Sequence, residues 1–457
     1  MAKEKKKQKE VTLRKAFQNG DIFTKLSFLF MGLGNIKRKQ FIKGILFFLS
    51  EIIFIAFMIL DGTQLVRGLM TLGTKKGGEV FNEQKQVYEY TQGDNSMLFL
   101  FYGLLAVFAI IFFIILWVSS AKSGYSAQLL EQKGKKAPSF MEDIKSLFNQ
   151  NIHKLLLSGP IACIFAFTVL PLVFMALIAF TNYDRNHQPP GKLFHWVGLA
   201  NFGELFKGGS GLGYAFWHIL GWTIIWAIFA TMLNYILGMI LAMVINREET
   251  KFKGFWRFIF VLSIAVPQFV SLLIMRTMLQ PEGAVNALLK QFGLIDASLP
   301  FWTNTTWARV TIIVVNLWVG IPFTMLQTTG ILQNIPKELY EAAKVDGANA
   351  VVRFFKITLP YMLFVTTPYL ITQFIGNINN FNVIYLLTKG FPASMDYNNG
   401  TAGKTDLLVT WLYKLTIDFK DYNYGAVIAI MVFILSAIFS LLAYRHTGAF
   451  KNEEGFQ

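Results

Sequence analysis

The sequence is poor in charge, in cysteine and in histidine for a chain of 457 residues. Only 15% of the residues are charged whereas 54% are hydrophobic, and a water-facing shell could not cover so much apolar surface. The same hydrophobic content excludes intrinsic disorder. The single cysteine, Cys163, excludes an intramolecular disulfide framework. These shortages leave a membrane protein with several spans as the expected class.

Long apolar runs are the main feature that is present. A membrane-spanning helix needs about 20 apolar residues, and eight runs approach or exceed that length, near 41–61, 97–118, 155–181, 217–246, 256–279, 309–332, 360–380 and 424–445. The run 217–246 contains no Asp, Glu, Lys or Arg. The sequence therefore predicts an all-α, polytopic membrane protein with eight transmembrane helices.

The formal net charge of +15 predicts the orientation of these spans. Of the 42 Lys and Arg residues, 27 fall on the side of the N-terminus and 12 on the opposite loops. Cytoplasmic loops carry the excess of Lys and Arg, so both ends are expected in the cytoplasm and no nucleic-acid partner is expected. The basic N-terminal stretch is too long for a cleavable signal peptide, and Glu51 interrupts the apolar run after it. Residues 22–39 suit a helix on the inner membrane surface, or a basic tail that only orients the chain.

No catalytic or metal-binding constellation is evident. The stretch 400–405 resembles a phosphate-binding loop, but that motif requires Gly where Asn398 stands. We expect it to be an outer loop that enters a helix, with Thr405 or Asp406 as the cap. The five His residues are scattered, so neither a metal site nor a cofactor is expected. The chain is thus predicted not to be an enzyme, and if ATP drives it, another chain must bind the ATP.

The cytoplasmic loop 333–359 is the most informative stretch. Pro336 stands where a first helical turn tolerates proline, Glu338 favours the positive helix N-terminus, and Gly347 can adopt the left-handed conformation that ends a helix. We expect a helix of about three turns outside the bilayer, followed by a sharp corner. The small residues Ala342 and Ala343 would let another protein approach closely. Phe354, Phe355 and Ile357 are expected to anchor the second half of the loop.

The spacing in this loop resembles the signature loop of permease subunits in bacterial ATP-binding-cassette importers. The pattern is Glu-Ala-Ala, three residues, Gly, nine residues and Ile-x-Leu-Pro. Composition alone favours an ordinary helix-turn-helix here, but a gapped pattern of this length rarely arises by chance. In that family the loop is a coupling helix that docks into the ATPase subunit and switches the spans between inward- and outward-facing states. The resemblance assigns ATPase coupling to Glu341, Ala342, Ala343, Asp346, Gly347, Ile357, Leu359 and Pro360.

The resemblance extends over roughly 155–445 and points to the larger permease subunit of maltose/maltodextrin importers. It is carried by eight spans and by the segments 263–268, 318–323, 373–381 and 405–409. It implies the type I importer permease fold, with four parts: a basic cytoplasmic segment 1–40, two extra spans and a loop 41–154, a six-span core 155–445 that contains the coupling loop 333–359, and a cytoplasmic tail 446–457. One departure is large, because only 182–216 stands where the best-known relative has a folded periplasmic insertion. A short loop suits a bacterium whose sugar-binding protein is lipid-anchored outside the cell membrane.

Polar residues within the spans indicate a sugar site. Gln373, Asn377 and Asn380 share one helix face by their spacing, and carboxamides both donate to and accept from sugar hydroxyls. Phe323 can stack on a pyranose ring, and Pro267 and Pro322 are expected to interrupt regular helical hydrogen bonding. Amides in membranes also hold helices together, and the residues alone do not decide between the two roles. The resemblance favours the sugar and assigns contacts to Ile264, Gln268, Val319, Gly320, Phe323, Gln373, Asn377 and Asn380.

Several of these positions depart from the family pattern. Phe323 and Ile264 each replace a Tyr, and Gln268 and Gln373 each replace a Ser, so hydrogen bonding to the sugar differs. The resemblance implies a second permease subunit, two ATPase subunits, an external sugar-binding lipoprotein and an oligosaccharide substrate. The rival hypotheses are an importer for another oligosaccharide, an ion-coupled transporter, and a membrane scaffold or enzyme. Paired intramembrane carboxylates, which ion coupling would favour, are not evident.

We expect Glu51 to pair with a polar group of a neighbouring helix, and 405–417 to form a helix over the outer mouth.

Overall fold

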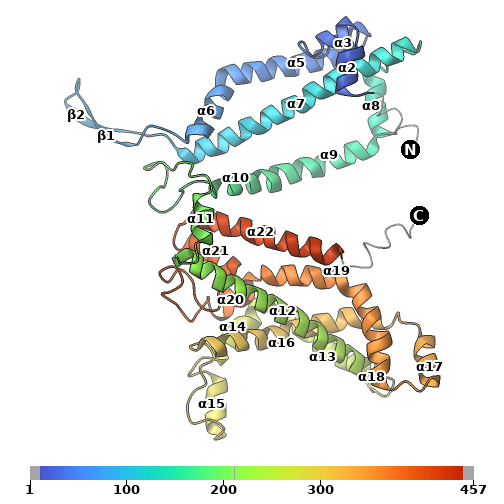
Figure 1. The fold of residues 1–457 in the computed structure, drawn as a ribbon, viewed down its shortest axis with the longest axis vertical. Helices are drawn as coiled ribbons and strands as arrows, with labels where there is room; N and C mark the ends of the chain where they lie inside the picture. Colours follow the sequence, from blue (N-terminus) through green and yellow to red (C-terminus); the bar gives the residue numbers. More distant parts are fainter. Residues whose placement is uncertain (1–10, 210, 446–457) are drawn as a thin grey trace. The chain divides into compact units, whose positions relative to one another are not determined.

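The computed structural model describes residues 11–209 and 211–445, which fall into two compact units, Met1–Val197 and Gly198–Gln457 (Figure 1). The described part of the first unit contains nine α-helices, two π-helical turns and one hairpin. Their bounds in chain order are α2 Leu13–Asn19, α3 Ile22–Leu26, α4 Leu33–Lys37, α5 Phe41–Phe57, η1 Met58–Gly62, α6 Thr63–Thr71, β1 Gly78–Asn82, β2 Val87–Thr91, α7 Ser96–Gln132, α8 Phe140–Phe148, α9 Ile152–Ile164, η2 Phe165–Val169 and α10 Leu170–Ile178.

The described part of the second unit is helical throughout, apart from its loops. Its elements are α11 Ala200–Phe206, α12 Gly211–Asn246, α13 Lys253–Ala265, α14 Gln268–Met278, α15 Ala284–Gln291, α16 Thr305–Leu332, α17 Lys337–Val345, α18 Ala350–Arg353, η3 Phe354–Thr358, α19 Leu359–Ile378, α20 Phe381–Leu387, α21 Leu408–Ile417 and α22 Tyr422–Arg445. Helix α12 packs along α16 and α19. Trp222, Trp226, Leu272 and Ile312 are buried in the core that α12 and α16 share with α14 and α20.

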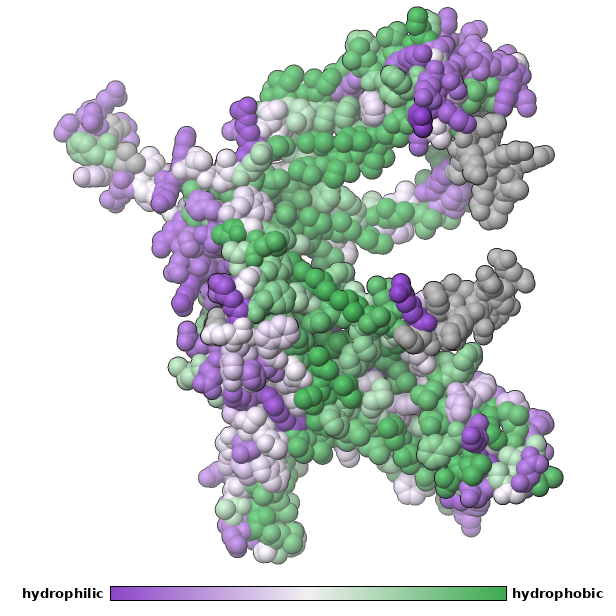
Figure 2. All heavy atoms as spheres, in the orientation of Figure 1, coloured by the Kyte–Doolittle hydropathy of each residue, from purple (hydrophilic) through white to green (hydrophobic). Residues whose placement is uncertain are grey.

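The described residues contain seven helices that are long and apolar enough to span a membrane, or eight if one bent pair counts as a single span. Figure 2 shows hydrophobic residues along the long helices of each unit and hydrophilic residues toward their ends. The predicted eight spans are therefore confirmed with one difference, which concerns the fifth. The all-α prediction is also confirmed, except for an antiparallel hairpin of β1 and β2 that pairs Gly78 with Thr91.

The predicted fifth span, 256–279, is bent by 85° between α13 and α14. Helix α13 ends at Ala265, and Val266 is extended at φ −80° and ψ 125°. Proline disfavours the helical conformation of the residue before it and has no N–H for the helical ladder, so Pro267 explains the break. Pro322, by contrast, lies inside α16, which continues from Thr305 to Leu332. The sequence predicted an interrupted helix at both prolines. The helix is broken at Pro267 and continues through Pro322.

The segment 22–39 forms two short helices rather than one. Gly32, with φ +84°, separates α3 from α4. Arg38 is buried and donates to Asp21 at 2.7 Å and to Glu131 of α7 at 3.1 Å. Gly34 lies so close to Gly124 of α7 that a Cβ on Gly34 would be 3.2 Å from the Gly124 Cα. The segment is thus a folded part of the first unit, packed on α7, and not only a basic tail.

Glu51 is buried in α5 and binds the backbone of this N-terminal segment. Its Oε2 accepts a hydrogen bond of 2.7 Å from the Met31 N–H, which is itself buried. The acidic side chain therefore has a polar partner, as expected. The partner is a backbone amide that precedes α4, and not a side chain of a neighbouring spanning helix.

Replacing Glu51 with Leu is expected to lower the midpoint of thermal unfolding of the purified protein. The Met31 N–H would lose its acceptor inside the protein, and an unsatisfied buried donor costs about 1–3 kcal/mol. Glu51→Gln keeps a carbonyl oxygen at this place and serves as the matched control, with most of the stability retained. Equal midpoints for Glu51→Leu and the native protein would show that this hydrogen bond contributes nothing.

Candidate functional site

A small cavity lies between α12, α16 and α19, in the middle of the second unit. Its volume is about 50 Å³, and its lining consists of Ala230, Thr231, Asn234, Tyr235, Gly320, Phe323, Thr324, Tyr369, Leu370 and Gln373. One water molecule needs about 10–15 Å³ of such space. The cavity therefore has room for a few waters or for one arm of a larger ligand, but not for a whole sugar ring. It brings together three of the predicted sugar contacts, Gly320, Phe323 and Gln373.

Asn377 and Asn380 lie close together on the same helix end but do not line this cavity. The Asn377 Nδ2 donates to Thr231 Oγ1 of α12 at 3.0 Å, and its backbone oxygen accepts from Trp226 Nε1 at 3.1 Å. The Asn380 Nδ2 donates to Asn377 Oδ1 at 3.4 Å, and Asn380 Oδ1 accepts from the N–H of Val383 at 3.2 Å. In this structure both amides therefore join helices or cap α20.

The other three predicted contacts lie outside the cavity lining. Ile264 is near the end of α13 and Gln268 begins α14, so both flank the bend at Pro267, and both are exposed. Val319 is half-buried in α16, directly before Gly320. Of the eight predicted positions, three line the cavity, two lie at the end of α19, two flank the bend, and Val319 lies in α16 beside the cavity residue Gly320.

The wall of the cavity that α12 contributes was not predicted from the sequence. Asn234 and Tyr235 come from the run without Asp, Glu, Lys or Arg, and Tyr369 lies on the same helix as Gln373. Tyr235 Oη hydrogen-bonds with Thr366 Oγ1 of α19 at 2.7 Å. The signal for Asn234 was present, because an amide in mid-span needs a partner or a cavity.

The coupling loop forms the exposed helix that was expected. Helix α17 has nine residues, which is about two and a half turns, and Pro336 stands directly before it instead of in its first turn. Gly347 has φ +76°, the left-handed conformation predicted for the helix end. Glu341, Ala342 and Asp346 are exposed, while Ala343 is half-buried.

Two contacts tie this loop to the spanning helices. Tyr340 Oη of α17 hydrogen-bonds with Thr358 Oγ1 at the start of α19, at 2.8 Å. Phe354 packs against a core of Tyr235, Met239 and Met362, and Ile357 is half-buried. The anchoring predicted for Phe355 is wrong, because its side chain is 58% exposed. The π-helical turn η3 places Phe354 toward the core and its neighbour outward.

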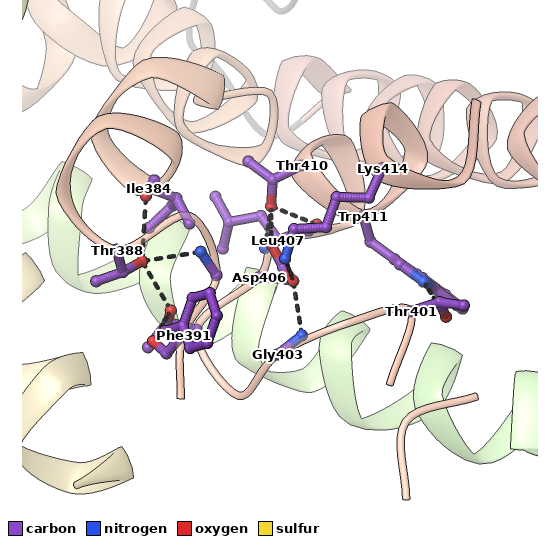
Figure 3. Close-up of polar contacts among 12 residues, drawn as sticks. Ile384, Thr388, Phe391, Thr401, Gly403, Asp406, Leu407, Thr410, Trp411 and Lys414 are labelled. Carbon is purple, nitrogen blue, oxygen red and sulfur yellow. Dashed lines mark hydrogen bonds and ion pairs between the residues drawn. The ribbon is translucent and has the colours of Figure 1, made fainter. Parts of the chain in front are cut away.

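A buried polar network holds the loop 388–407 against α21 (Figure 3). Asp406 is fully buried, and its Oδ2 accepts from Lys414 Nζ at 2.6 Å and from the Gly403 N–H at 2.7 Å. Its Oδ1 accepts from Thr410 Oγ1 at 2.9 Å. Burial raises the pKa of the Asp406 carboxyl, whereas the Lys414 ammonium and the hydrogen bonds lower it. Gly390 has φ +84° and lies against this carboxyl, where a Cβ would come within 2.2 Å of Asp406 Oδ1.

The expected helix after this loop is present as α21, and it buries Leu408, Trp411 and Leu415. The predicted cap is wrong, however. The residue before the helix is Leu407, whose N–H donates to Thr410 Oγ1 at 2.9 Å. Thr405 pairs instead with Thr388 Oγ1 at 2.9 Å, and the Asp406 carboxylate is engaged by Lys414. Both predicted caps are therefore used to close the loop and not to begin the helix.

The sequence and the fold were compared with those of known proteins. Residues 234–450 match the family described as the binding-protein-dependent transport system inner membrane component. The chain is 36% identical over 425 residues to the galactooligosaccharides transport system permease protein GanP of Bacillus subtilis (strain 168), with 92% of this chain and 96% of that protein covered. It is 34% identical over 433 residues to the maltodextrin transport system permease protein MalC of Streptococcus pneumoniae serotype 4, with 93% and 95% covered.

A relative from Vibrio vulnificus (strain YJ016), the maltose/maltodextrin transport system permease protein MalF, is 35% identical over 275 residues. That match covers 59% of this chain and 52% of the relative. Among solved structures, a bacterial ABC transporter that imports the acidic polysaccharide alginate shares the fold at a TM-score of 0.54 and 22% identity. The match covers 66% of this chain and 96% of the solved one. The chain belongs to the family of binding-protein-dependent transport system inner membrane components, as a multi-pass permease of an ABC importer.

Proposed function

We propose that this chain is the larger permease subunit of an ATP-driven sugar importer in a bacterial cell membrane, most suited to maltose and maltodextrins. It would pair with a second permease subunit and two ATPase subunits, and receive sugar from an external binding lipoprotein. Both termini would lie in the cytoplasm, because 27 of the 42 Lys and Arg residues fall on that side. The ATP would be bound and hydrolysed by the ATPase subunits.

The observation that carries this proposal is that the coupling loop contacts the helices that line the cavity. Helix α17 is exposed, and Tyr340 ties it to Thr358, directly before α19. Phe354 packs against the buried cluster that Tyr235 and Met239 of α12 form with Met362 of α19, and both α12 and α19 line the cavity. A push on α17 by a closing ATPase dimer would therefore move the cavity walls, which is what alternating access requires.

The residues at the bend at Pro267 are a second argument for the proposal, because they are consistent with a route for a polar substrate. Gln268 is exposed on the surface of the second unit, and a polar amide that faces lipid is unfavourable. The side chain would be accommodated if it faced a water-filled path that a second permease subunit completes. Ile264 lies on the other side of the same bend. The predicted contacts at the bend and in the cavity would then line one route from different helices.

The predicted sugar contacts are testable at Asn377 and Asn380. In the proposed transport cycle their amides exchange hydrogen bonds within the protein for bonds to sugar hydroxyls. Alanine at both positions is expected to abolish sugar uptake while the subunits still assemble, measured by uptake and by co-purification. Asn379→Ala is the matched control, because this amide is exposed and bonds only its own helix, at Ile375 O. Uptake at the native rate by the double variant would contradict a role in sugar binding.

The function itself is tested by reconstitution of the native chain with its second permease, ATPase and binding protein in liposomes. Uptake of maltodextrin that requires both ATP and the binding protein would support the proposal, and uptake without the ATPase would refute it. A second candidate substrate is a galactooligosaccharide, because a permease for such sugars is 36% identical over 92% of this chain. Both sugars should therefore be compared in the same assay.

A further inference from the structure

An amide in the fourth span, Asn234, lines the cavity beside Gly320 and Gln373. Its Nδ2 donates to the Ala230 carbonyl oxygen, one helical turn earlier, at 2.7 Å. A carbonyl oxygen can accept this bond only from the amide nitrogen, so the orientation of the amide is fixed. The Asn234 Oδ1 must therefore point away from Ala230.

The Asn234 Oδ1 is buried and has no hydrogen-bond partner among the described residues. A buried acceptor without a partner costs free energy, and native proteins rarely retain one without a reason. Three other polar groups of the lining are already hydrogen-bonded, and one of them, the Thr231 hydroxyl, accepts from Asn377. Tyr235 bonds Thr366, and the Thr324 hydroxyl donates to the Gly320 carbonyl at 3.1 Å. The oxygen of Asn234 is thus an acceptor still available at the cavity.

Gly320 provides the space in which this amide lies. A Cβ on Gly320 would come within 2.3–2.5 Å of the Asn234 side-chain Nδ2, Cγ and Oδ1. Any larger residue at 320 would displace the amide. The absence of a side chain at this position therefore keeps Asn234 at the cavity, next to Phe323, whose ring is exposed.

We propose that Asn234 Oδ1 accepts a hydrogen bond from one hydroxyl of the transported sugar, so that α12 contributes a specificity-determining residue. This assignment rests on the proposed function. The cavity of about 50 Å³ admits a hydroxyl or hydroxymethyl arm, while the ring itself lies outside it against Phe323. An acceptor at a fixed place selects among sugars that differ in one hydroxyl, because a buried polar group left unpaired is costly.

The experiment measures uptake by the full complex in liposomes, with the native oligosaccharide and with a series of its monodeoxy analogues. For each analogue, the ratio of its uptake to that of the native sugar is compared between native protein and Asn234→Leu. Because the same binding protein serves both, its own preference cancels in the comparison. Asn379→Leu is the control, since this amide makes the same bond to its own helix but is exposed and away from the cavity.

The native complex is expected to disfavour one analogue by about tenfold, the size of one hydrogen bond. In Asn234→Leu the uptake of that one analogue should become nearly equal to the uptake of the native sugar. The uptake ratios of the other analogues should stay as they are in the native complex. Asn234→Ser, which can still bond the Ala230 carbonyl, replaces the Leu variant in the same comparison if the latter does not assemble.

Two other results have different meanings. Normal uptake with every ratio unchanged in the variant would overturn this assignment alone and leave the acceptor to a resident water. Failure of the native complex to take up any oligosaccharide would overturn the proposed function and this assignment with it.

Discussion

Replacing Gly347 with Asp is expected to reduce ATP-driven uptake to background, while the binding protein still holds its sugar. Gly347 ends α17 with φ +76°, and an ideal Cβ at this position meets nothing within 4 Å. The chain itself therefore has room for a side chain, and Asp tolerates the left-handed conformation better than most residues. A complete loss of transport would accordingly indicate a clash or a buried charge at the surface that docks on this corner, which in the proposed function belongs to the ATPase subunit.

The matched control for this variant is Gly134→Asp. Gly134 also has a left-handed φ of +69°, also has open space around its Cβ position, and lies on the same predicted side of the membrane. The backbone strain and added charge are thus equal, and only the predicted docking surface differs. We expect native uptake from Gly134→Asp, and ATPase subunits that bind weakly or hydrolyse ATP without transport in Gly347→Asp. Normal uptake by the Gly347 variant would refute the coupling role of the loop.

Replacing Asp406 with Asn is expected to destabilise the second unit by about 3–5 kcal/mol, the usual effect of removing one partner of a buried ion pair. Lys414, whose side chain is only 15% exposed, would lose the carboxylate that it contacts at 2.6 Å. The bond to the Gly403 N–H would also weaken, because a neutral amide oxygen replaces a carboxylate. The first measurement is the thermal unfolding midpoint of the purified complex. The second is the rate at which a protease cleaves the loop 388–407.

The control pair lies in the same loop. Lys404 and Asp396 are 4.0 Å apart, with the Asp396 side chain 75% exposed, so Asp396→Asn should change stability by less than about 1 kcal/mol. A second comparison combines Asp406→Asn with Lys414→Met, which removes both charges together. The double variant should recover much of the lost stability. If the single variant unfolds at the native temperature, the network does not stabilise the loop.

The sequence predicted well what depends on local chemistry. Apolar length located the spans, and glycine at 347 located the end of α17 because few other residues adopt its φ at no cost. The bend at Pro267 was predicted as an interruption, but its angle depends on packing of α14 against α20, which no local pattern encodes. Likewise Asp406 looked like a helix cap, because its partners Gly403 and Lys414 are brought together only by the folded loop.

The candidate site was predictable only in part, for the same reason. Gly320, Phe323 and Gln373 do line one cavity, as polar and aromatic residues in spans suggested. The role of Asn377 could not be derived, because its partner Thr231 lies 146 residues earlier in the chain. An amide in mid-span marked Asn234 as a residue that needs a partner or a cavity, but its place at this cavity depends on the space left by Gly320 of another helix.

The bend between α13 and α14 has a consequence for the thickness of the permeability barrier. Two helices that meet at 85° cannot both lie along the membrane normal, so only one contributes its full length to the crossing. At 1.5 Å per residue, the 13 residues of α13 cover about 20 Å and the 11 residues of α14 about 16 Å. Both fall short of the hydrocarbon core of about 30 Å. Neither helix alone therefore matches the thickness of the barrier, and the non-helical backbone at Val266 and Pro267 needs cover from other protein or from water.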